Sequence, residues 1–391
     1  MGITKRINLN SLYIFLFLVV FPFGQIIRLS LNFAGVTIPV QPIDIIVGGA
    51  ALYAFLKKFK KPAVFKYFLN FMAVMVFSFI LSYFIFKTPL VIYGLLYLFR
   101  LSAYVVFGVY VWNFAKNSLK NKKFLLDCLL IVSVASAVFG WVQFFMVPDL
   151  KPLFALGWDM HLFRLVGTFL DPTYLGLIIV FGLIISLGRS IESKNWKDIV
   201  IAIFLLISLA FTYSRGSYLA FGAAVLTVIC LEKRFKKLLL LVFALGAIAL
   251  VLPTASNHSI EILRTRSILD RLGSYQSTLK IFSRFPVFGV GYDNMCIAYQ
   301  KYIGPQDFSS HSCSGSDSSL LLILATSGIV GFLIFLDLVV KILRFLNKSA
   351  ESKIFTASGV ALFVHSLFSN SLFYPWIMGW IIILLAISLT D

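Results

Sequence analysis

Charge is scarce in this chain of 391 residues, because Asp, Glu, Lys and Arg together make up only 13% of it. Soluble domains carry about 25% charged residues, so the polar surface that is left is too small to cover a water-facing fold. Cysteine is also rare, with four residues, and no CxxC, HExxH or P-loop spacing occurs. The sequence therefore offers no recognisable metal or nucleotide site.

Apolar residues are abundant instead, at 60% of the chain. A continuous apolar stretch of about 20 residues spans a bilayer as a helix, and such stretches recur from end to end. A β-barrel would need alternating segments of about ten residues, which are not found. We expect spans at 11–28, 36–56, 63–86, 90–114, 122–147, 165–187, 197–213, 214–231, 235–253, 318–343, 354–371 and 372–389. The predicted fold is an all-α polytopic transmembrane bundle of about twelve helices, with residues 1–391 as a single membrane domain.

The distribution of Lys and Arg predicts the orientation, since basic residues favour cytoplasmic loops. With the N-terminus inside, the inner segments hold most of the 34 basic residues, and the alternation is regular at every short loop. We expect a multi-pass protein of the inner (plasma) membrane with both termini in the cytoplasm. Most of the net charge of +18 then follows from the membrane orientation: the basic clusters face anionic lipid headgroups, and no nucleic-acid partner is needed.

One long extracytoplasmic loop is predicted at 254–317, between the ninth and tenth spans. Ile260, Leu263, Ile268, Leu269, Leu272, Leu279 and Phe282 recur in it at roughly helical spacing. Pro286 ends that run, so we expect an amphipathic helix at the membrane surface, followed by a turn at Phe288 to Gly291. Cys296 and Cys313 both fall in this loop and can form a disulfide if the compartment is oxidising.

A set of arginines lies at or near the predicted outer face, where basic residues in short loops are unusual. They are Arg164, Arg215, Arg264, Arg266, Arg271 and Arg284. Arginine grips phosphate oxygens with a planar fork, so the cluster suits an anionic headgroup such as a diphosphate. The alternative is that these residues pair with Asp159, Asp171, Asp270 or Asp293, or reach phospholipid headgroups. Arg215 is the strongest candidate, because it sits where two spans meet.

Two further residues are candidates for chemistry at the end of the loop. His311 or Asp317 could act as a general base towards a sugar hydroxyl. The structural alternatives are a solvated histidine and an aspartate that caps the tenth span. Arg100 falls near the middle of the fourth span without an obvious partner. His161, His258 and His365 have no supporting neighbours in the sequence.

Four segments resemble the O-antigen ligase and polymerase superfamily. Residues 164–176 resemble its RxxGxFxxPNxLG pattern, and residues 212–217 resemble its TxSRG turn. Arg271 followed by Pro286, Gly289 and Gly291 resembles its loop pattern of an arginine before PxxGxG. Residues 317–331, which end in a GxxG helix, resemble the segment after the loop. The four pieces occur in the family order, which makes the match more specific than any one of them.

The resemblance implies a membrane glycosyltransferase that works on the outer face without a metal or cofactor. Its donor would be a glycan linked to polyprenyl (undecaprenyl) diphosphate, used in O-antigen, exopolysaccharide or lipopolysaccharide biosynthesis. Arg215 and Arg271 would hold the diphosphate leaving group and Arg164 would support them, while His311 or Asp317 would act on the acceptor. A polymerase of this kind can also work with a chain-length regulator.

One departure separates the branches of the family. The ligases, which transfer glycan to lipid A core, carry His-Asn eleven residues before the first glycine of GxxG, where this chain has Asp317. Thr173 also replaces an Asn that the family favours. We therefore expect a polymerase, with the ligase as the alternative. The alternative from another class is a flippase for lipid-linked oligosaccharides, which would place charges along a path through the bilayer rather than at one face.

Overall fold

The protein is described by a computed structural model that covers residues 9–33, 36–156, 158–193, 195–232, 266–305 and 315–389. The predicted ninth span at 235–253 lies outside these residues, as do His311 and Cys313. The N-terminal half contains α1 (Leu9–Val20), η1 (Phe21–Phe23), β1 (Leu29–Phe33), β2 (Val36–Val40), α2 (Pro42–Leu56), α3 (Phe65–Phe86), η2 (Pro89–Ile92), α4 (Tyr93–Ala115), α5 (Leu119–Met146) and η3 (Lys151–Leu156). The C-terminal half contains η4 (Gly167–Phe169), α6 (Pro172–Ser193), α7 (Trp196–Phe211), α8 (Arg215–Glu232), α10 (Arg266–Arg284), α11 (Met295–Tyr302), α12 (Ser319–Phe345), α13 (Ala350–His365) and α14 (Pro375–Ser388).

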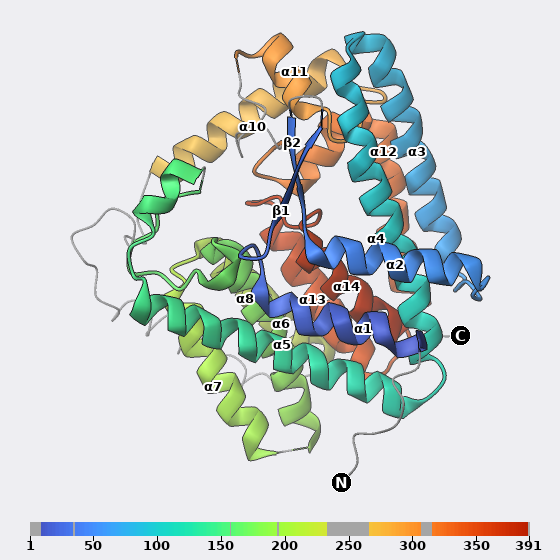
Figure 1. Cartoon of the computed structure of the whole chain (residues 1–391). Helices are drawn as coiled ribbons and strands as arrows, with labels where there is room; N and C mark the ends of the chain where they lie inside the picture. The colour runs from blue at the N-terminus through green and yellow to red at the C-terminus, as the bar shows by residue number, and fades with distance from the viewer. Residues whose placement is uncertain are drawn as a thin grey trace.

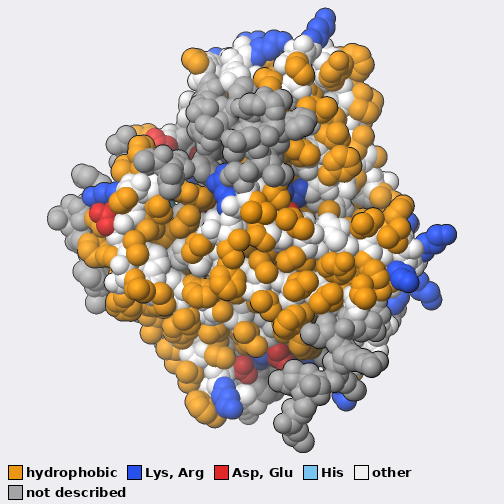
Figure 2. Space-filling view, viewed as in Figure 1, with side chains coloured by type: hydrophobic (Ala, Val, Ile, Leu, Met, Phe, Trp, Pro, Cys, Tyr) orange, Lys and Arg blue, Asp and Glu red, His pale blue; other side chains and the backbone are white. Residues whose placement is uncertain are grey.

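Long apolar helices dominate the part of the chain that the structure describes. Six of them are long and apolar enough to cross a membrane: Phe65–Phe86, Pro89–Ala115, Leu119–Met146, Pro172–Ser190, Arg215–Glu232 and Ser319–Phe345. Shorter apolar helices lie at Ser11–Phe23, Pro42–Leu56 and Pro375–Ser388. Figure 2 shows hydrophobic side chains over a broad band of one face, with most basic side chains near its margins. These features confirm a helical, polytopic membrane protein.

A small β-hairpin is the one departure from an all-α fold among the described residues. Strands β1 and β2 pair antiparallel, with Leu29 opposite Val40. The predicted second span therefore does not begin at residue 36: its helix begins at Pro42, where Gln41 is extended. Proline fixes a helical φ and has no N–H to lose at the first position of a helix, which explains this start. The hairpin crosses the middle of the view in Figure 1.

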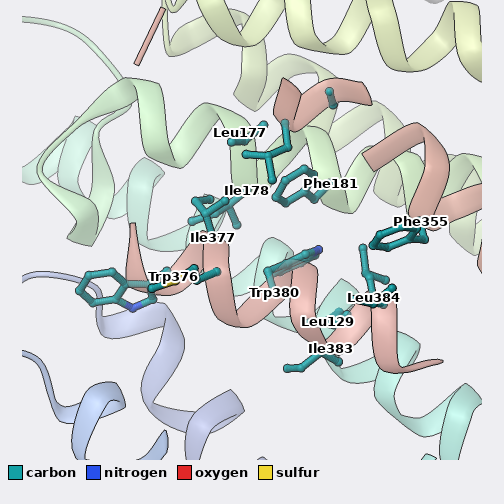
Figure 3. Close-up of a cluster of buried hydrophobic side chains, with 14 of the residues drawn as sticks. Leu129, Leu177, Ile178, Phe181, Phe355, Trp376, Ile377, Trp380, Ile383 and Leu384 are labelled. Atoms are coloured by element: carbon teal, nitrogen blue, oxygen red, sulfur yellow. The ribbon is translucent and has the colours of Figure 1, made fainter. Parts of the chain in front are cut away.

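The core is centred on α14, which is buried along most of its length. Trp376 and Trp380 have 1% and 0% of their surfaces exposed, and Phe181 of α6 packs against Trp380 at 5.8 Å between ring centroids. Figure 3 shows side chains of α5, α6 and α13 meeting those of α14 around these rings. Since hydrocarbon tails are as apolar as leucine, such close packing is what holds helices together in a bilayer.

The two ends of the bundle differ in their charges. At one end, Arg189 of α6 pairs with Asp127 of α5, and Lys353 of α13 pairs with Glu232 of α8 at 2.7 Å. Arg189, Glu232 and Lys353 lie in segments predicted to face the cytoplasm, and Asp127 lies near the cytoplasmic end of the predicted span at 122–147. The opposite end gathers the N-termini of α6, α8, α12 and α14 and the C-termini of α7 and α13. We call this opposite end the site end.

Helix α12 is interrupted at Gly328, whose φ of 66° and ψ of −170° are not helical. The turn that follows α10 docks into this break: Val290 and Gly291 donate to the carbonyls of Ala325 and Thr326, at 3.0 and 2.9 Å. In return, the N–H groups of Ile329 and Val330 donate to the carbonyls of Pro286 and Val287. The freed backbone groups of the broken helix are thus satisfied by protein rather than left in lipid.

The predicted amphipathic helix of the long loop is present as α10. Ile281 and Thr278 are buried, whereas Ile268, Leu269, Leu272 and Leu279 are exposed. The helix ends at Arg284, just before Pro286, as the sequence predicts. In Figure 1 it extends along the edge of the molecule, and α11 lies beside its C-terminal end near the tips of α3 and α4. An amphipathic helix with an exposed apolar face suits the interface of a bilayer.

Candidate functional site

The turn between α7 and α8 carries Arg215, the strongest candidate from the sequence. Thr212 closes the end of α7, since its hydroxyl donates to the carbonyl of Leu209 at 2.6 Å and accepts from the N–H of Ser214 at 3.2 Å. Tyr213 adopts the left-handed conformation that reverses the chain, with φ 49°. Ser217 then hydrogen-bonds to Ser214, with 2.8 Å between their oxygens. Arg215 opens α8 as a half-buried residue in a tightly bonded turn.

Arg164 holds this turn from outside. Its Nε donates to the carbonyl of Thr212 at 3.0 Å, and its guanidinium also donates to the carbonyl of Tyr213 at 3.2 Å. The adjacent N–H of Leu165 donates to the carbonyl of Phe211 at 2.9 Å. A cation at the C-terminal end of a helix is favourable, because unsatisfied carbonyls point there. Arg164 therefore positions the turn that carries Arg215.

His365, the last residue of α13, also contacts the turn that carries Arg215. It is fully buried, with Nδ1 at 2.6 Å from the Ser371 hydroxyl and Nε2 at 3.4 Å from the Ser217 hydroxyl. Ser217 in turn donates to the carbonyl of Thr173, at the start of α6. No motif surrounds His365, and its partners are 148 and 6 residues away, so nothing in the sequence singles it out.

Helix α10 brings Arg271 to the site end. Tyr275 donates to the carbonyl of Leu367 at 2.5 Å, which fastens α10 to the end of α13. The half-buried Arg271 lies within electrostatic reach of His365 and of Asp317. The structure thus brings Arg271 to the histidine that contacts the Arg215 turn.

Asp317 lies directly before α12 and faces α10. Its N–H donates to the hydroxyl of Ser274 at 3.2 Å. Desolvation raises the pKa of the Asp317 carboxyl above its ordinary value, while the Arg271 charge and a hydrogen bond with Ser274 oppose this rise. The cap of α12 is Ser318, whose hydroxyl accepts from the N–H of Leu321, so the predicted cap at Asp317 is off by one residue.

Asp171 and Tyr174, at the start of α6, complete the group. Asp171 accepts a hydrogen bond from the N–H of Thr173 at 2.6 Å, so its carboxylate caps the helix, and burial raises its pKa. The ring of Tyr174 stacks on that of Tyr374 with centroids 3.8 Å apart. The site end thus holds acidic groups, Asp171 and Asp317, as well as the arginines.

The remaining candidates fall elsewhere or outside the described residues. Arg284 stacks over Tyr302 at 4.7 Å, at the far end of α10. Arg100 pairs at 2.8 Å with Asp44 of α2, a partner that lies on another helix and was not evident from the sequence. Cys296 is disulfide-bonded, whereas Cys128 and Cys230 are free. Across the described ranges, no three His, Cys, Asp or Glu side chains come together as metal ligands.

The geometry suits the binding of an anion next to a weak base. Arg215 lies at a helix N-terminus, where backbone N–H groups favour negative charge, and Arg271 faces the same cluster from another helix. Arginine at such a place binds phosphate oxygens in two parallel hydrogen bonds. A carboxyl of raised pKa, such as that of Asp317, is a stronger base than an ordinary carboxylate.

Comparison with known proteins gives one family. The family model described as O-antigen ligase matches residues 200–336, which run from α7 to α12 and include Arg215, Arg271 and Asp317. The search of curated proteins finds no match. The match covers three of the four segments whose resemblance was noted in the sequence, and Arg164 lies ahead of it.

Proposed function

We propose that this chain is a membrane glycosyltransferase that polymerises a surface polysaccharide. The family model described as O-antigen ligase, which matches residues 200–336, supports this proposal. The donor is a glycan repeat unit on polyprenyl diphosphate, most simply undecaprenyl diphosphate. The site end faces outward, with both termini in the cytoplasm. The observation that carries the proposal is the convergence of Arg215, Arg271 and Asp317 at one end of the bundle.

The diphosphate is the part of the donor that the arginines recognise. Arg215 and Arg271 come from different helices, so they can contact the two phosphates from two sides. As the glycosidic bond to the diphosphate breaks, negative charge grows on the leaving oxygen, and fixed cations stabilise it. Arg164 contributes through the turn it holds, since its guanidinium group donates to the carbonyls of Thr212 and Tyr213.

The reaction is a displacement at the anomeric carbon of the donor sugar. A hydroxyl oxygen of the acceptor sugar forms the new glycosidic bond, the bond from that carbon to the diphosphate oxygen breaks, and polyprenyl diphosphate leaves with the electron pair. The hydroxyl proton passes to a base. We assign that base to Asp317, or to His311, which lies outside the described residues.

The acceptor distinguishes the proposed polymerase from its alternative, a ligase. The family description favours a ligase, which would use lipid A core as acceptor. Asp317 at the position where the ligases carry histidine favours the polymerase, whose acceptor is another lipid-linked glycan. The two reactions share the donor and the arginines and differ in the acceptor alone.

The test uses purified protein in detergent with a polyprenyl-diphosphate oligosaccharide as the only glycan. A ladder of products at repeat-unit spacing indicates the polymerase. Transfer only after addition of lipid A core indicates the ligase. Absence of transfer in both arms, with the host's own repeat unit, refutes the enzyme and favours the flippase.

A matched pair of arginine variants locates the activity. Arg215→Ala should abolish the ladder, because it removes a guanidinium group that binds the diphosphate. Arg284→Ala is the control, since this residue stacks on Tyr302 away from the cluster and should leave the ladder intact. Equal ladders from both variants, each inserted at wild-type level, would contradict the assignment of Arg215.

A further inference from the structure

A second polar cluster is built mainly from the N-terminal half of the chain, which the family match does not cover. Its centre is Arg100 of α4, which pairs with Asp44 at 2.8 Å and donates to the carbonyl of Pro39 at 3.2 Å. Tyr104 also donates to Asp44, at 3.2 Å. The Arg100 guanidinium lies 5.0 Å from the centroid of the Tyr97 ring.

Two charged groups of this cluster keep hydrogen-bonding capacity that the described residues do not use. Asp293 accepts no hydrogen bond from any described residue, although Arg100 lies within electrostatic reach of it. Its φ of 59° is unusual for a residue other than glycine. The Nε of Arg28 is buried without a partner, and its guanidinium lies 5.9 Å from the centroid of the Trp158 ring. Buried polar groups are nearly always bonded, so the Nε of Arg28 calls for a ligand or water.

The position of Asp293 is firmly fixed. The next residue, Asn294, donates from its side chain to Ser82 of α3 at 2.8 Å and from its backbone to Gly291 at 3.2 Å. On the other side, a Cβ at Gly94 of α4 would meet the carbonyl oxygen of Tyr292 at 2.7 Å, so only glycine allows this close approach. Strained backbone that its surroundings hold in place is a frequent property of binding sites.

A row of amide and phenol groups connects this cluster to the arginine site. Gln41 donates to Gln25 at 2.7 Å, and Gln25 donates to the Tyr374 hydroxyl at 3.3 Å. Tyr374 stacks on Tyr174, whose neighbour Thr173 bonds to Ser217 in the Arg215 turn. The row therefore runs without interruption from the proposed diphosphate site to Asp44, the N3 residue of α2, whose side chain accepts from the N–H of Gln41.

The balance of charge decides which ligand fits. The second cluster holds two arginines and two aspartates, so a diphosphate bound there would face the carboxylates of Asp44 and Asp293. Sugar hydroxyls both donate and accept, and they suit carboxylates, guanidinium groups and amides equally well. The apolar face of a sugar ring packs on aromatic rings such as those of Tyr97 and Trp158. Figure 2 shows basic side chains in the middle of this face, above the hydrophobic band.

We propose that Arg28, Asp293, Tyr97 and Trp158 form a subsite for the saccharide part of the substrate, on the acceptor side of the arginine site. This inference rests on the proposed function and deepens it. Binding energy gained on the glycan would hold the acceptor hydroxyl at the anomeric carbon of the donor, which is how remote contacts raise the rate of a transfer.

The test separates sugar binding from diphosphate binding and from catalysis. The first probe is the free oligosaccharide repeat unit, released from the host polysaccharide by mild acid, and the second is farnesyl diphosphate. Binding of each to the full-length protein in detergent is measured by calorimetry. We expect Asp293→Asn and Trp158→Ala to weaken oligosaccharide binding about tenfold or more while farnesyl diphosphate binds as before. Arg215→Ala should give the opposite pattern.

The inference is overturned if Asp293→Asn and Trp158→Ala bind the oligosaccharide like the wild type, or if they lose both probes equally. Trp158 lies in a surface loop, so its variant keeps the test informative should Asp293→Asn fail to fold. The proposed function is tested independently by the ladder: a wild-type ladder together with unchanged oligosaccharide binding in the variants would refute the subsite alone. Absence of any ladder from the wild type, with oligosaccharide binding that depends on Asp293, would refute the enzyme and retain the subsite.

Discussion

The break in α12 at Gly328 offers the sharpest prediction, because only glycine fits there. A φ of 66° with a ψ of −170° is a region essentially restricted to glycine, and another residue held in it costs about 1–3 kcal/mol. An added Cβ would also overlap the carbonyl oxygen of Val287. Backbone cannot swing aside as a flexible side chain does, so the turn at 286–291 must move.

The cost follows from the hydrogen bonds that fasten this turn. Four backbone bonds, from 2.8 to 3.2 Å, join residues 286–291 to the broken helix. Each contributes about 0.5–1.5 kcal/mol, so the loss of two adds about 1–3 kcal/mol to the backbone strain. We expect Gly328→Ala to destabilise the protein by about 2–6 kcal/mol and to reduce the glycan ladder, since the displaced turn carries α10 and Arg271 with it.

The assay is thermal unfolding in detergent, followed by the ladder at a temperature where both proteins stay folded. Gly222→Ala in α8 is the matched control, because a Cβ there meets nothing within 4 Å and alanine is the better helix former by about 1 kcal/mol. A melting temperature and ladder for Gly328→Ala equal to those of the control would refute the role assigned to the break.

Four further predictions follow from the same contacts. Arg164→Gln should lower both the melting temperature and the ladder, with Arg164→Lys intermediate, because a single ammonium cannot span the carbonyls of Thr212 and Tyr213 as the guanidinium does. His365→Ala should reduce activity and destabilise the protein by about 1–3 kcal/mol, because the buried hydroxyl of Ser371 loses its partner; full activity would contradict this. Arg100→Met should cost about 3–5 kcal/mol in thermal or denaturant unfolding by leaving Asp44 buried and unpaired, and adding Asp44→Leu should recover much of it. Burial raises the pKa of Asp293 from 3.8 to about 8, so stability should fall as the pH rises from about 4 to 8, and Asp293→Asn should lack this part of the pH dependence in unfolding measured from pH 4 to 9.

Much of the fold could be predicted because its signals are local. Apolar runs long enough to span a bilayer indicated the helices, and the spacing before Pro286 indicated α10. The start of α2 was misplaced by six residues, since β-branched residues before Pro42 extend the apolar run but form a strand. The sequence around Gly328 does not indicate the break in α12, because the break depends on hydrogen bonds to the turn at 286–291, some forty residues earlier.

The site was predicted in part, and the reason is similar. Arg215, Arg271 and Asp317 are carried by motifs, and in the structure Arg271 lies within electrostatic reach of Asp317 and of the histidine that contacts the Arg215 turn. Arg164 was expected to support Arg215 and Arg271, and it hydrogen-bonds to the carbonyls of Thr212 and Tyr213 in the turn that carries Arg215. His365 and the partner of Arg100 escaped notice, because both depend on contacts between helices that the sequence alone does not pair.

The way in which the Arg215 turn is held has a consequence for exchanging parts between relatives. The matched stretch, residues 200–336, does not contain its own supports: Arg164 precedes it, and His365 and Ser371 follow it. A chimera that transplants only this stretch would place a foreign turn on native supports, and the fit between them would limit which donors work. A viable graft therefore extends from Arg164 to Tyr374, so that the turn travels with the residues that hold it.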